Sequence, residues 1–226
     1  MRNLLYLVML AVFSGYGGGA AADTQAFYVL PAPRSDSNTS VEQALVSRRS
    51  RRSFHDTPLS IEKLSQILWA AYGITDSERG FRTAPSAGAL FPLEIYVVVG
   101  NVTGLSPGVY KYVAQGHKII KIADGDIRAE LAEAAIGQPM PKYAPATVVY
   151  TAVFDRTVVE YGVRGRQRYV FADLGHSAQN IHLQAETLGL GTVAIGAFTD
   201  ERIKELLHLP AEEEPLYLMP IGYAGL

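Results

Sequence analysis

Residues 95–122 read IYVVVGNVTGLSPGVYKYVAQGHKIIKI, and this stretch decides the fold class. It opens with a continuous β-branched and aromatic run, 95–99, which predicts a buried strand. Two shorter runs, 109–113 and 118–122, flank a Gln-Gly pair and predict a hairpin. A hairpin among the strands does not belong to a regular βαβ winding. The stretch therefore favours an α+β fold.

Further helices and strands are predicted on both sides of this stretch. Apolar residues at helical spacing predict helices at 41–47, 59–72, 126–136, 168–188 and 200–207. Ser40 is the expected cap of the first of these helices, with Gln43 at its third position. Apolar runs predict strands at 146–154, 192–195 and 216–221. We expect a central mixed, mostly antiparallel sheet flanked by helices.

Composition limits the chemistry of the chain. Its 226 residues suggest one domain, and an apolar content of 48% is enough for a sizeable core. With no cysteine, thiol nucleophiles, thiolate metal sites and iron–sulfur clusters are excluded, so redox chemistry requires a bound organic cofactor. The net charge of −2 provides no overall field that would attract nucleic acid, and we expect no nucleic-acid partner.

The first residues predict export. A short basic start is followed by an apolar run at 4–13 and by Ala20-Ala21-Ala22, which is the pattern of a secretory signal peptide. The run is shorter than the roughly 20 residues that span a bilayer. We expect a signal peptide at 1–22, cut after Ala22, an arm or linker at 23–40, and a domain at 41–226. The protein would then be periplasmic or secreted. The alternatives are a buried first helix and an uncleaved anchor.

Four arginines within five positions form the densest charge cluster of the chain: Arg48, Arg49, Arg51 and Arg52, with Ser50 between them. Guanidinium groups match phosphate oxygens in pairs, and a serine adds a hydroxyl donor, so the cluster predicts a phosphate site. The alternative is a solvated helix terminus, where cations favour the helix dipole. The cluster is too short, and lacks the interleaved aromatics, for a nucleic-acid surface.

Two small-residue segments could approach a flat ligand. In the segment 83–92, Ser86 lies among small residues between two prolines and could bind a ligand edge. The segment 188–198 contains no GxGxxG fingerprint and runs from a helix into a strand, which argues against a dinucleotide site of the Rossmann type. Gly196-Ala197 could instead present a backbone N–H to a ligand ring. Either segment could also be an ordinary loop.

The long predicted helix carries polar residues at helical spacing. Asp173, His176 and Asn180 could share one face, but a histidine and an asparagine four residues apart are poor zinc ligands, and we expect no metal site. The expected role of His176 is that of a buried histidine with satisfied hydrogen bonds.

Five motifs in order resemble the flavin-dependent nitroreductase superfamily, and within it the SagB/ThcOx-type dehydrogenases. They are RRSRRSF (48–54), APSAGALFPLEIYVV (84–98), YGVRGRQRY with DLGHSAQN (161–180), LGLGTVAIGAF (188–198) and PIGYA (220–224). The resemblance implies a nitroreductase-like α+β fold and a homodimer that binds FMN between its protomers.

The resemblance also implies roles for individual residues. Arg48, Arg49, Ser50 and Arg52 match phosphate and ring-edge contacts. Ser86, Ala87 and Gly88 match a loop that approaches the flavin from the partner subunit. Gly196 and Ala197 match a segment whose backbone amide faces flavin N5.

The implied activity is ping-pong hydride transfer through flavin N5, from a donor such as NAD(P)H to a nitroaromatic, a quinone or another small organic acceptor. The azoline dehydrogenases of this branch use a Lys-Tyr pair, where this chain has Arg168-Tyr169. Arginine cannot act as a base near neutral pH, so Tyr169 is the one catalytic candidate. The alternatives are a SagB-type dehydrogenase of a peptide or heterocycle and a flavin-binding protein without catalysis.

Overall fold

The computed structural model describes residues 26–225. The predicted signal peptide, 1–22, lies outside the described residues. Within them, no helix combines the length and the apolar character that crossing a bilayer would require.

Seven strands form the central sheet, in the order β1-β8-β7-β5-β9-β11-β10, and every neighbouring pair is antiparallel. The strands are β1 (Phe27–Val29), β5 (Leu93–Val99), β7 (Gly108–Val113), β8 (Lys118–Asp124), β9 (Ala146–Val153), β10 (Gly191–Thr192) and β11 (Glu213–Gly222). The predicted strand 95–99 and the predicted hairpin are confirmed as β5 and β7–β8. Gly116 turns this hairpin with a φ of 78°, a conformation that glycine adopts without strain.

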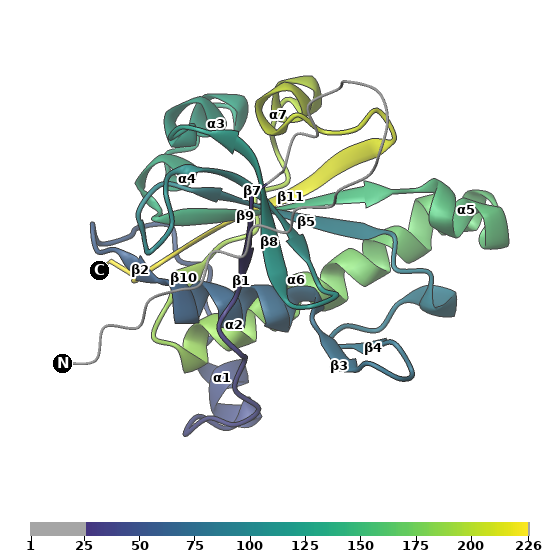
Figure 1. Ribbon diagram of the computed structural model, residues 1–226, viewed down its shortest axis with the longest axis horizontal. Coiled ribbons are helices and arrows are strands. Elements are labelled where there is room, and N and C mark those ends of the chain that lie inside the picture. The colour runs from purple at the N-terminus through teal and green to yellow at the C-terminus, as the bar shows by residue number, and fades with distance from the viewer. Residues whose placement is uncertain (1–25, 226) are drawn as a thin grey trace, which may run out of the picture.

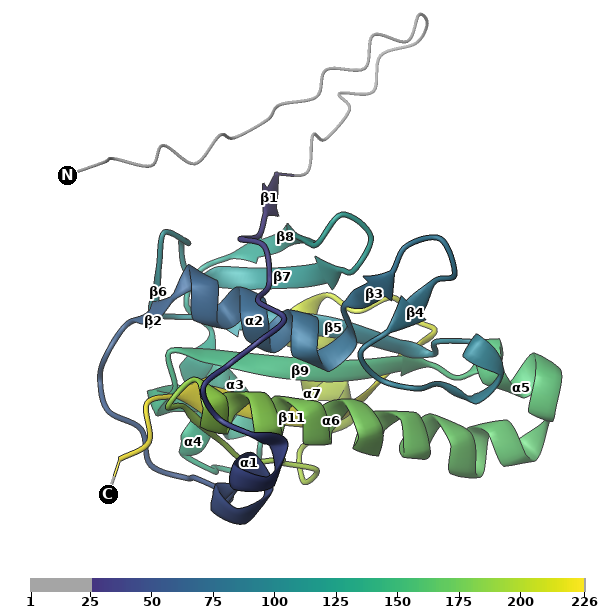
Figure 2. The ribbon, with the colours of Figure 1, turned by 90° about the horizontal axis from the view of Figure 1, so that it is seen from below.

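Helices cover both faces of the sheet (Figure 1). On one face lie α1 (Val41–Ser47), α2 (Ile61–Tyr72) and α6 (Val170–Thr187), which Figure 2 shows in front of the sheet. On the other lie α3 (Arg128–Ala134), α4 (Met140–Tyr143) and α7 (Asp200–Leu207). Each face has its own apolar cluster, so the sheet is buried on both sides. Because all neighbouring strands of this sheet are antiparallel, the α+β prediction is confirmed.

Helix ends follow local chemistry. Ser40 caps α1 by accepting a 3.1 Å hydrogen bond from the backbone N–H of Gln43, as predicted. Ser60 caps α2 in the same way. Gly73 follows the last residue of α2, and a Cβ at that position would lie 2.2 Å from a ring carbon of Trp69, so only glycine fits there.

Several short elements were not predicted from the sequence patterns. They are β2 (Leu59–Ser60), which pairs in parallel with β6 (Val102–Thr103), the hairpin of β3 (Ile74–Asp76) and β4 (Phe81–Arg82), a 3₁₀ turn (Ala87–Ala89), α5 (Asp155–Tyr161) and a π-helical turn (Gly165–Tyr169). The predicted arm carries β1 and thus adds a strand to the edge of the sheet. Parallel pairing, expected in the central sheet, is confined here to β2–β6 and a bridge between Ser50 and Thr192.

Candidate functional site

The arginine segment, residues 48–53, leaves the C-terminus of α1 and lies beside β10. Ser50 forms a parallel bridge with Thr192, and the backbone N–H of Arg51 donates a 2.9 Å hydrogen bond to the Thr192 carbonyl. The Ser53 carbonyl accepts a 2.8 Å hydrogen bond from the backbone N–H of Gly225. The backbone of the segment is therefore fixed by residues far along the chain.

The arginines of this segment divide into two kinds. Arg49 Nη1 donates to the carbonyls of Val46 and Arg48, at 3.0 and 2.7 Å, and so closes the C-terminus of α1. Arg48, Arg51 and Arg52 form no side-chain hydrogen bond or ion pair with any described residue. The helix-terminus interpretation holds for Arg49, whereas the other three guanidinium groups are available to an anion.

Polar atoms without partners lie next to this segment. His182 Nδ1 and Thr192 Oγ1 are buried and have no hydrogen-bonding partner within the described part of the chain. Burial and the nearby charge of Arg48 lower the pKa of His182. Because buried polar atoms are normally satisfied, such atoms beside free guanidinium groups fit a site that accommodates a polar, anionic ligand.

The 86–88 loop lies at the start of α6. The Ser86 hydroxyl donates to Asp173 Oδ2 at 2.5 Å, and the backbone N–H of Ala87 donates to Oδ1 at 3.2 Å. Ser86 Oγ also accepts a 2.9 Å hydrogen bond from the backbone N–H of Phe91. Burial raises the pKa of Asp173, against the effect of the two donated hydrogen bonds. The carboxylate fixes the shape of the loop.

Tyr161 connects this loop with Tyr169, the catalytic candidate. A Cβ on Gly88 would lie 2.7 Å from the hydroxyl of Tyr161, so only glycine leaves room for that hydroxyl. The rings of Tyr161 and Tyr169 meet edge to face with centroids 4.9 Å apart. The structure therefore brings Tyr169 close to the 86–88 loop.

Gly196 and Ala197 lie on an exposed turn after β10. Gly196 lines a cavity of about 580 Å³, whose apolar wall includes Phe154, Phe171 and Phe198. An ion pair of 2.7 Å between Arg166 and Glu214 lies on the same wall. A flat organic molecule could enter this cavity beside the Gly196 backbone.

The predicted residues form two groups at opposite ends of α6. Asp173 holds the 86–88 loop near its N-terminus, whereas His182, beside Arg48, lies nine residues further on. At about 1.5 Å per residue, this is a separation of about 14 Å along the helix axis. One chain does not bring the 86–88 loop to the arginine segment.

The prediction for His176 is wrong. His176 is exposed, while Asp173 retains only 2% of its accessible surface. Asn180 Nδ2 donates to the carbonyl of Thr83 at 2.9 Å. The three residues therefore do not form one functional face. Among residues 26–225, no three His, Cys, Asp or Glu side chains gather as a metal site would require.

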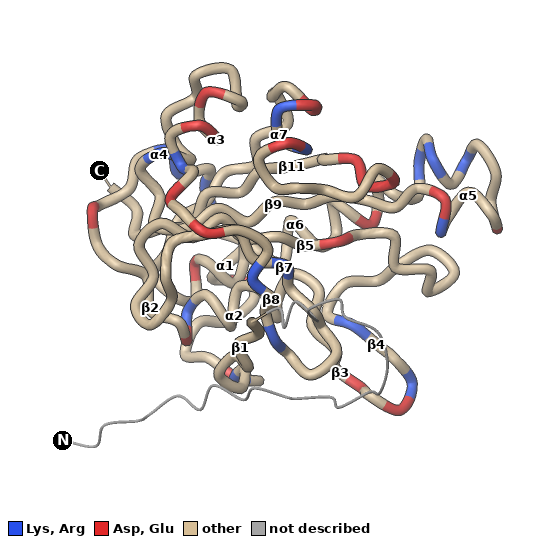
Figure 3. Tube along the Cα trace, turned by 45° about the horizontal axis from the view of Figure 1, so that its top comes forward, with Lys and Arg blue, Asp and Glu red and all other residues tan. Residues whose placement is uncertain are grey.

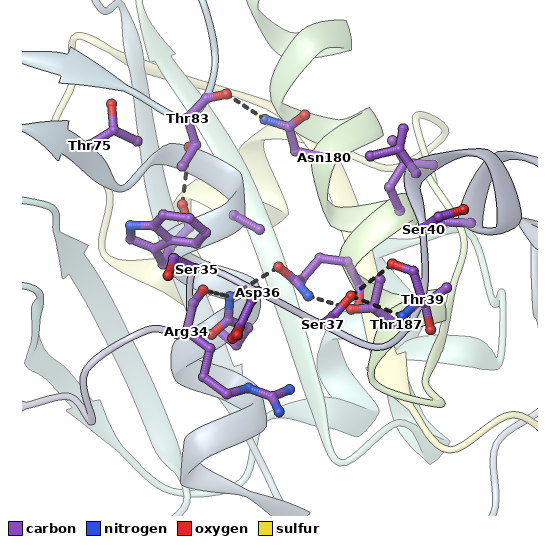
Figure 4. Close-up of a pocket in the computed structure, with 17 residues that line it drawn as sticks. Arg34, Ser35, Asp36, Ser37, Thr39, Ser40, Thr75, Thr83, Asn180 and Thr187 are labelled. Carbon is purple, nitrogen blue, oxygen red and sulfur yellow. Dashed lines mark hydrogen bonds between the residues drawn. The ribbon is translucent and has the colours of Figure 1, made fainter.

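A separate cavity of about 650 Å³ lies between residues 34–41, α2 and α6 (Figure 4). Gln66 bridges its walls: its side chain exchanges hydrogen bonds with the backbone of Arg34 and donates to Gln184 Oε1 at 3.1 Å. Thr83 and Asn180 meet at one end. None of the predicted site residues lines this cavity.

The sequence profile of the nitroreductase family matches residues 45–223. The chain belongs to the nitroreductase family. It is 50% identical over 182 residues to the "putative nitroreductase" of Methanocaldococcus jannaschii, covering 80% of this chain and 90% of that protein. Membership makes the chain an oxidoreductase and confirms the resemblance drawn from the motifs.

Other nitroreductase-family relatives carry more specific names. The FMN reductase [NAD(P)H] of Bacillus subtilis is 27% identical over 81% of this chain and 65% of that protein. The trifolitoxin-processing protein TfxB of Rhizobium leguminosarum is 33% identical over 58% of this chain, a match that spans 38% of its own length. The crystal structure of a "putative nitroreductase" from Ralstonia eutropha has a TM-score of 0.77, at 27% identity over 99% of this chain and 100% of that one.

Two contacts of the 86–88 loop, with Asp173 and with Tyr161, were not predicted from the sequence. The motifs include Asp173 and Tyr161, but neither was assigned to the 86–88 loop. The small residues at 86–89 indicate that a bulky side chain packs against the loop, but the sequence does not show which residue provides it.

Proposed function

We propose that this nitroreductase-family chain binds FMN at the interface of a homodimer and reduces a small organic acceptor. The observation that carries the proposal is the arginine segment. Its guanidinium groups at Arg48 and Arg52 have no partner among the described residues, and two orphaned polar atoms lie beside it. A phosphate would provide partners for these guanidinium groups and for the two orphaned atoms, because it brings negative charge and several acceptor oxygens.

The chain's own residues have separable tasks in this proposal. Arg48, Ser50 and Arg52 bind the phosphate, and Arg49 closes α1 beneath it. The backbone N–H of Ala197 donates to the ring edge. FMN, when bound, supplies hydride transfer through N5. The exposed cavity at Gly196 admits the donor and then the acceptor in a ping-pong cycle.

The two ends of α6 support the homodimer in this proposal. The 86–88 loop and the arginine segment lie at opposite ends of that helix, and a second copy would bring one against the other. The B. subtilis relative is named for the reduction of FMN by NAD(P)H, which supports NAD(P)H as the donor and FMN as a molecule that such a chain binds. A nitroaromatic or a quinone is the proposed acceptor.

The experiment compares flavins with and without a phosphate. The full chain is titrated with FMN and with riboflavin, and bound flavin is followed by its visible absorbance and quenched fluorescence. We expect FMN to bind roughly tenfold or more tightly than riboflavin, and Arg48→Gln with Arg52→Gln to abolish that preference. Arg202→Gln, which alters an exposed ion pair with Glu205, is the control. Equal binding of both flavins to the unaltered chain would reject the phosphate role.

A SagB-type dehydrogenase is the second candidate, favoured by the similarity to TfxB and by the position of Tyr169. Oxidation of a peptide or heterocycle requires a proton acceptor, and Arg168 cannot supply one. Tyr169→Phe would then remove dehydrogenation but leave NAD(P)H-driven reduction unchanged. Unchanged dehydrogenation in this variant would reject the role of Tyr169. A flavin-binding protein without catalysis would bind FMN yet turn over no donor and acceptor pair.

We also propose export, on the signal-peptide pattern at 1–22. Expression of the full chain in a bacterial host, followed by mass spectrometry of the periplasmic fraction, should give a protein that begins at Asp23. Intact chain confined to the cytoplasm would contradict it.

A further inference from the structure

A polar cavity of about 220 Å³ lies away from the proposed flavin contacts, where β5 and β7 separate. The two strands pair as far as Ile95 and Tyr112, and beyond this pair the cavity opens between them. Arg82 of β4 and Arg156 of α5 also line it. None of the residues predicted to bind FMN takes part.

Arg82 is the central cation of this cavity. Its guanidinium carbon lies 4.4 Å from the ring centroid of Tyr72 and 4.4 Å from that of Phe91. Contacts of this kind hold a guanidinium through its faces and leave the N–H groups along its edge free. The Arg82 guanidinium has no hydrogen bond or ion pair with any residue in the range 26–225. Its donors are therefore oriented and unused.

The other charges around the cavity do not compensate Arg82. Lys111 Nζ lies 3.0 Å from Glu94 and 2.8 Å from Glu213, and Arg156 lies 2.6 Å from Glu94. These two cations and two carboxylates balance one another. Figure 3 shows basic and acidic residues both distributed along the chain. Arg82 contributes one positive charge without a partner.

Tyr72 adds a second unsatisfied group. It retains 3% of its accessible surface and lines the cavity, and its hydroxyl, beside the backbone of Leu93, has no partner at hydrogen-bonding geometry within the described chain. A buried hydroxyl is normally hydrogen-bonded, so its unused donor is a second observation pointing to a ligand.

We propose that this cavity binds a small oxyanion, a carboxylate or a phosphate, through the edge of the Arg82 guanidinium. The cavity volume of about 220 Å³ has room for a small anion. The planar fork of arginine matches two oxygens of such a group, which a lysine ammonium cannot do.

The test uses the full chain saturated with FMN, so that added phosphate cannot bind at the proposed flavin site. Acetate, inorganic phosphate and chloride are titrated separately at constant ionic strength, while the Arg82 Nε–H resonance is followed by NMR. We expect the resonance to shift saturably with acetate or with phosphate and not to shift with chloride. The oxyanion that binds more tightly identifies whether the ligand is a carboxylate or a phosphate. The absence of a saturable shift with both oxyanions would overturn the proposal.

Arg82→Lys keeps the charge and removes the fork. We expect it to weaken oxyanion binding roughly tenfold or more, measured by calorimetry. Arg79→Lys alters an exposed arginine of the same hairpin, paired with Asp76, and should bind as the unaltered chain does. If Arg82→Lys does not fold, the NMR titration of the unaltered chain still decides. Equal affinity in the folded Arg82→Lys and Arg79→Lys variants would refute the role of Arg82.

Discussion

The Ser86 hydroxyl donates a 2.5 Å hydrogen bond to Asp173 Oδ2, although 87 residues separate the two in sequence. The neighbouring backbone N–H of Ala87 donates to the other oxygen of the same carboxylate. A buried acceptor thus binds both a side chain and the backbone of the 86–88 loop. The loop depends on α6 for its shape.

Loss of this carboxylate should destabilise the fold. Asp173→Ala leaves the Ser86 hydroxyl and the Ala87 N–H without their acceptor, and we expect the free energy of unfolding to fall by about 1–3 kcal/mol. Asp173→Asn keeps one acceptor oxygen and should cost less. Urea unfolding measures both, with the exposed Asp200→Ala as control. An Asp173→Ala variant as stable as the control would contradict the assignment.

Gly88 should tolerate a side chain less well than a glycine in open space. Gly88 has a φ of 60°, and a Cβ there would lie 2.7 Å from the Tyr161 hydroxyl. Gly80 has a φ of 71° with no atom within 4 Å of such a Cβ. Gly80→Ala should therefore show the backbone cost alone, about 1–2 kcal/mol, and Gly88→Ala should exceed it.

A double variant separates the two causes. Tyr161→Phe removes the hydroxyl, so combining it with Gly88→Ala should return the loss in unfolding free energy close to that of Gly80→Ala. No recovery in the double variant would show that the tyrosine hydroxyl is not the obstacle.

Glu213 should matter far more than its neighbour Glu214. Glu213 is 2% exposed and accepts hydrogen bonds from Lys111, Tyr96 and Thr151. Glu213→Leu leaves these donors without an acceptor. We expect the free energy of unfolding, measured by heat or urea, to fall by about 3–5 kcal/mol. Glu214→Leu breaks an exposed pair with Arg166 and should cost about 0–1 kcal/mol. Similar losses in the two variants would refute the buried network.

His117 holds one protonation state in the folded chain. The Ser65 hydroxyl donates its proton to the Pro31 carbonyl at 2.5 Å, so it must accept from His117 Nε2–H at 2.7 Å. Nδ1 is then unprotonated and accepts from the Tyr112 hydroxyl at 2.9 Å. The neutral ring ties the residues before α1 to α2 and to the β7–β8 hairpin.

Stability should fall on acidification. Burial lowers the pKa of His117 below its ordinary 6.5. Below about pH 6.5 the unfolded chain takes up a proton that the folded chain does not, so the free energy of unfolding decreases as pH drops, until the folded pKa is reached. His117→Gln should flatten this slope, with the part due to His182 left in place. The exposed His55→Gln should leave the slope unchanged, and an equally steep slope in His117→Gln would contradict the prediction.

The strands that sequence reasoning predicted are those with continuous β-branched runs. Residues 95–99 and 146–154 are central and buried on both faces, so almost every position is apolar and the pattern is strong. β1 could not be predicted, because its three residues stand beside prolines and pair only with β8. The predicted strand 192–195 shortens to β10 and a single bridge at Ile195, since the chain turns outward at Gly196.

The contacts among the candidate site residues could not be predicted from the sequence. His176 lies two residues from both Leu174 and Ala178, which face the core, and two residues correspond to about 200° around a helix. Periodicity therefore places it outside, in spite of its polar neighbours. The contact of Asp173 with Ser86 joins segments 87 residues apart, a relationship that no local pattern carries.

The pairing of the arginine segment has a consequence for biosynthesis. Its backbone partners Thr192 and Gly225 both follow it in the chain by more than a hundred residues. Residues 48–53 therefore emerge early but acquire their bound conformation only after more than a hundred further residues have been translated. The phosphate site proposed for this segment can therefore form only after that later part of the chain has been translated.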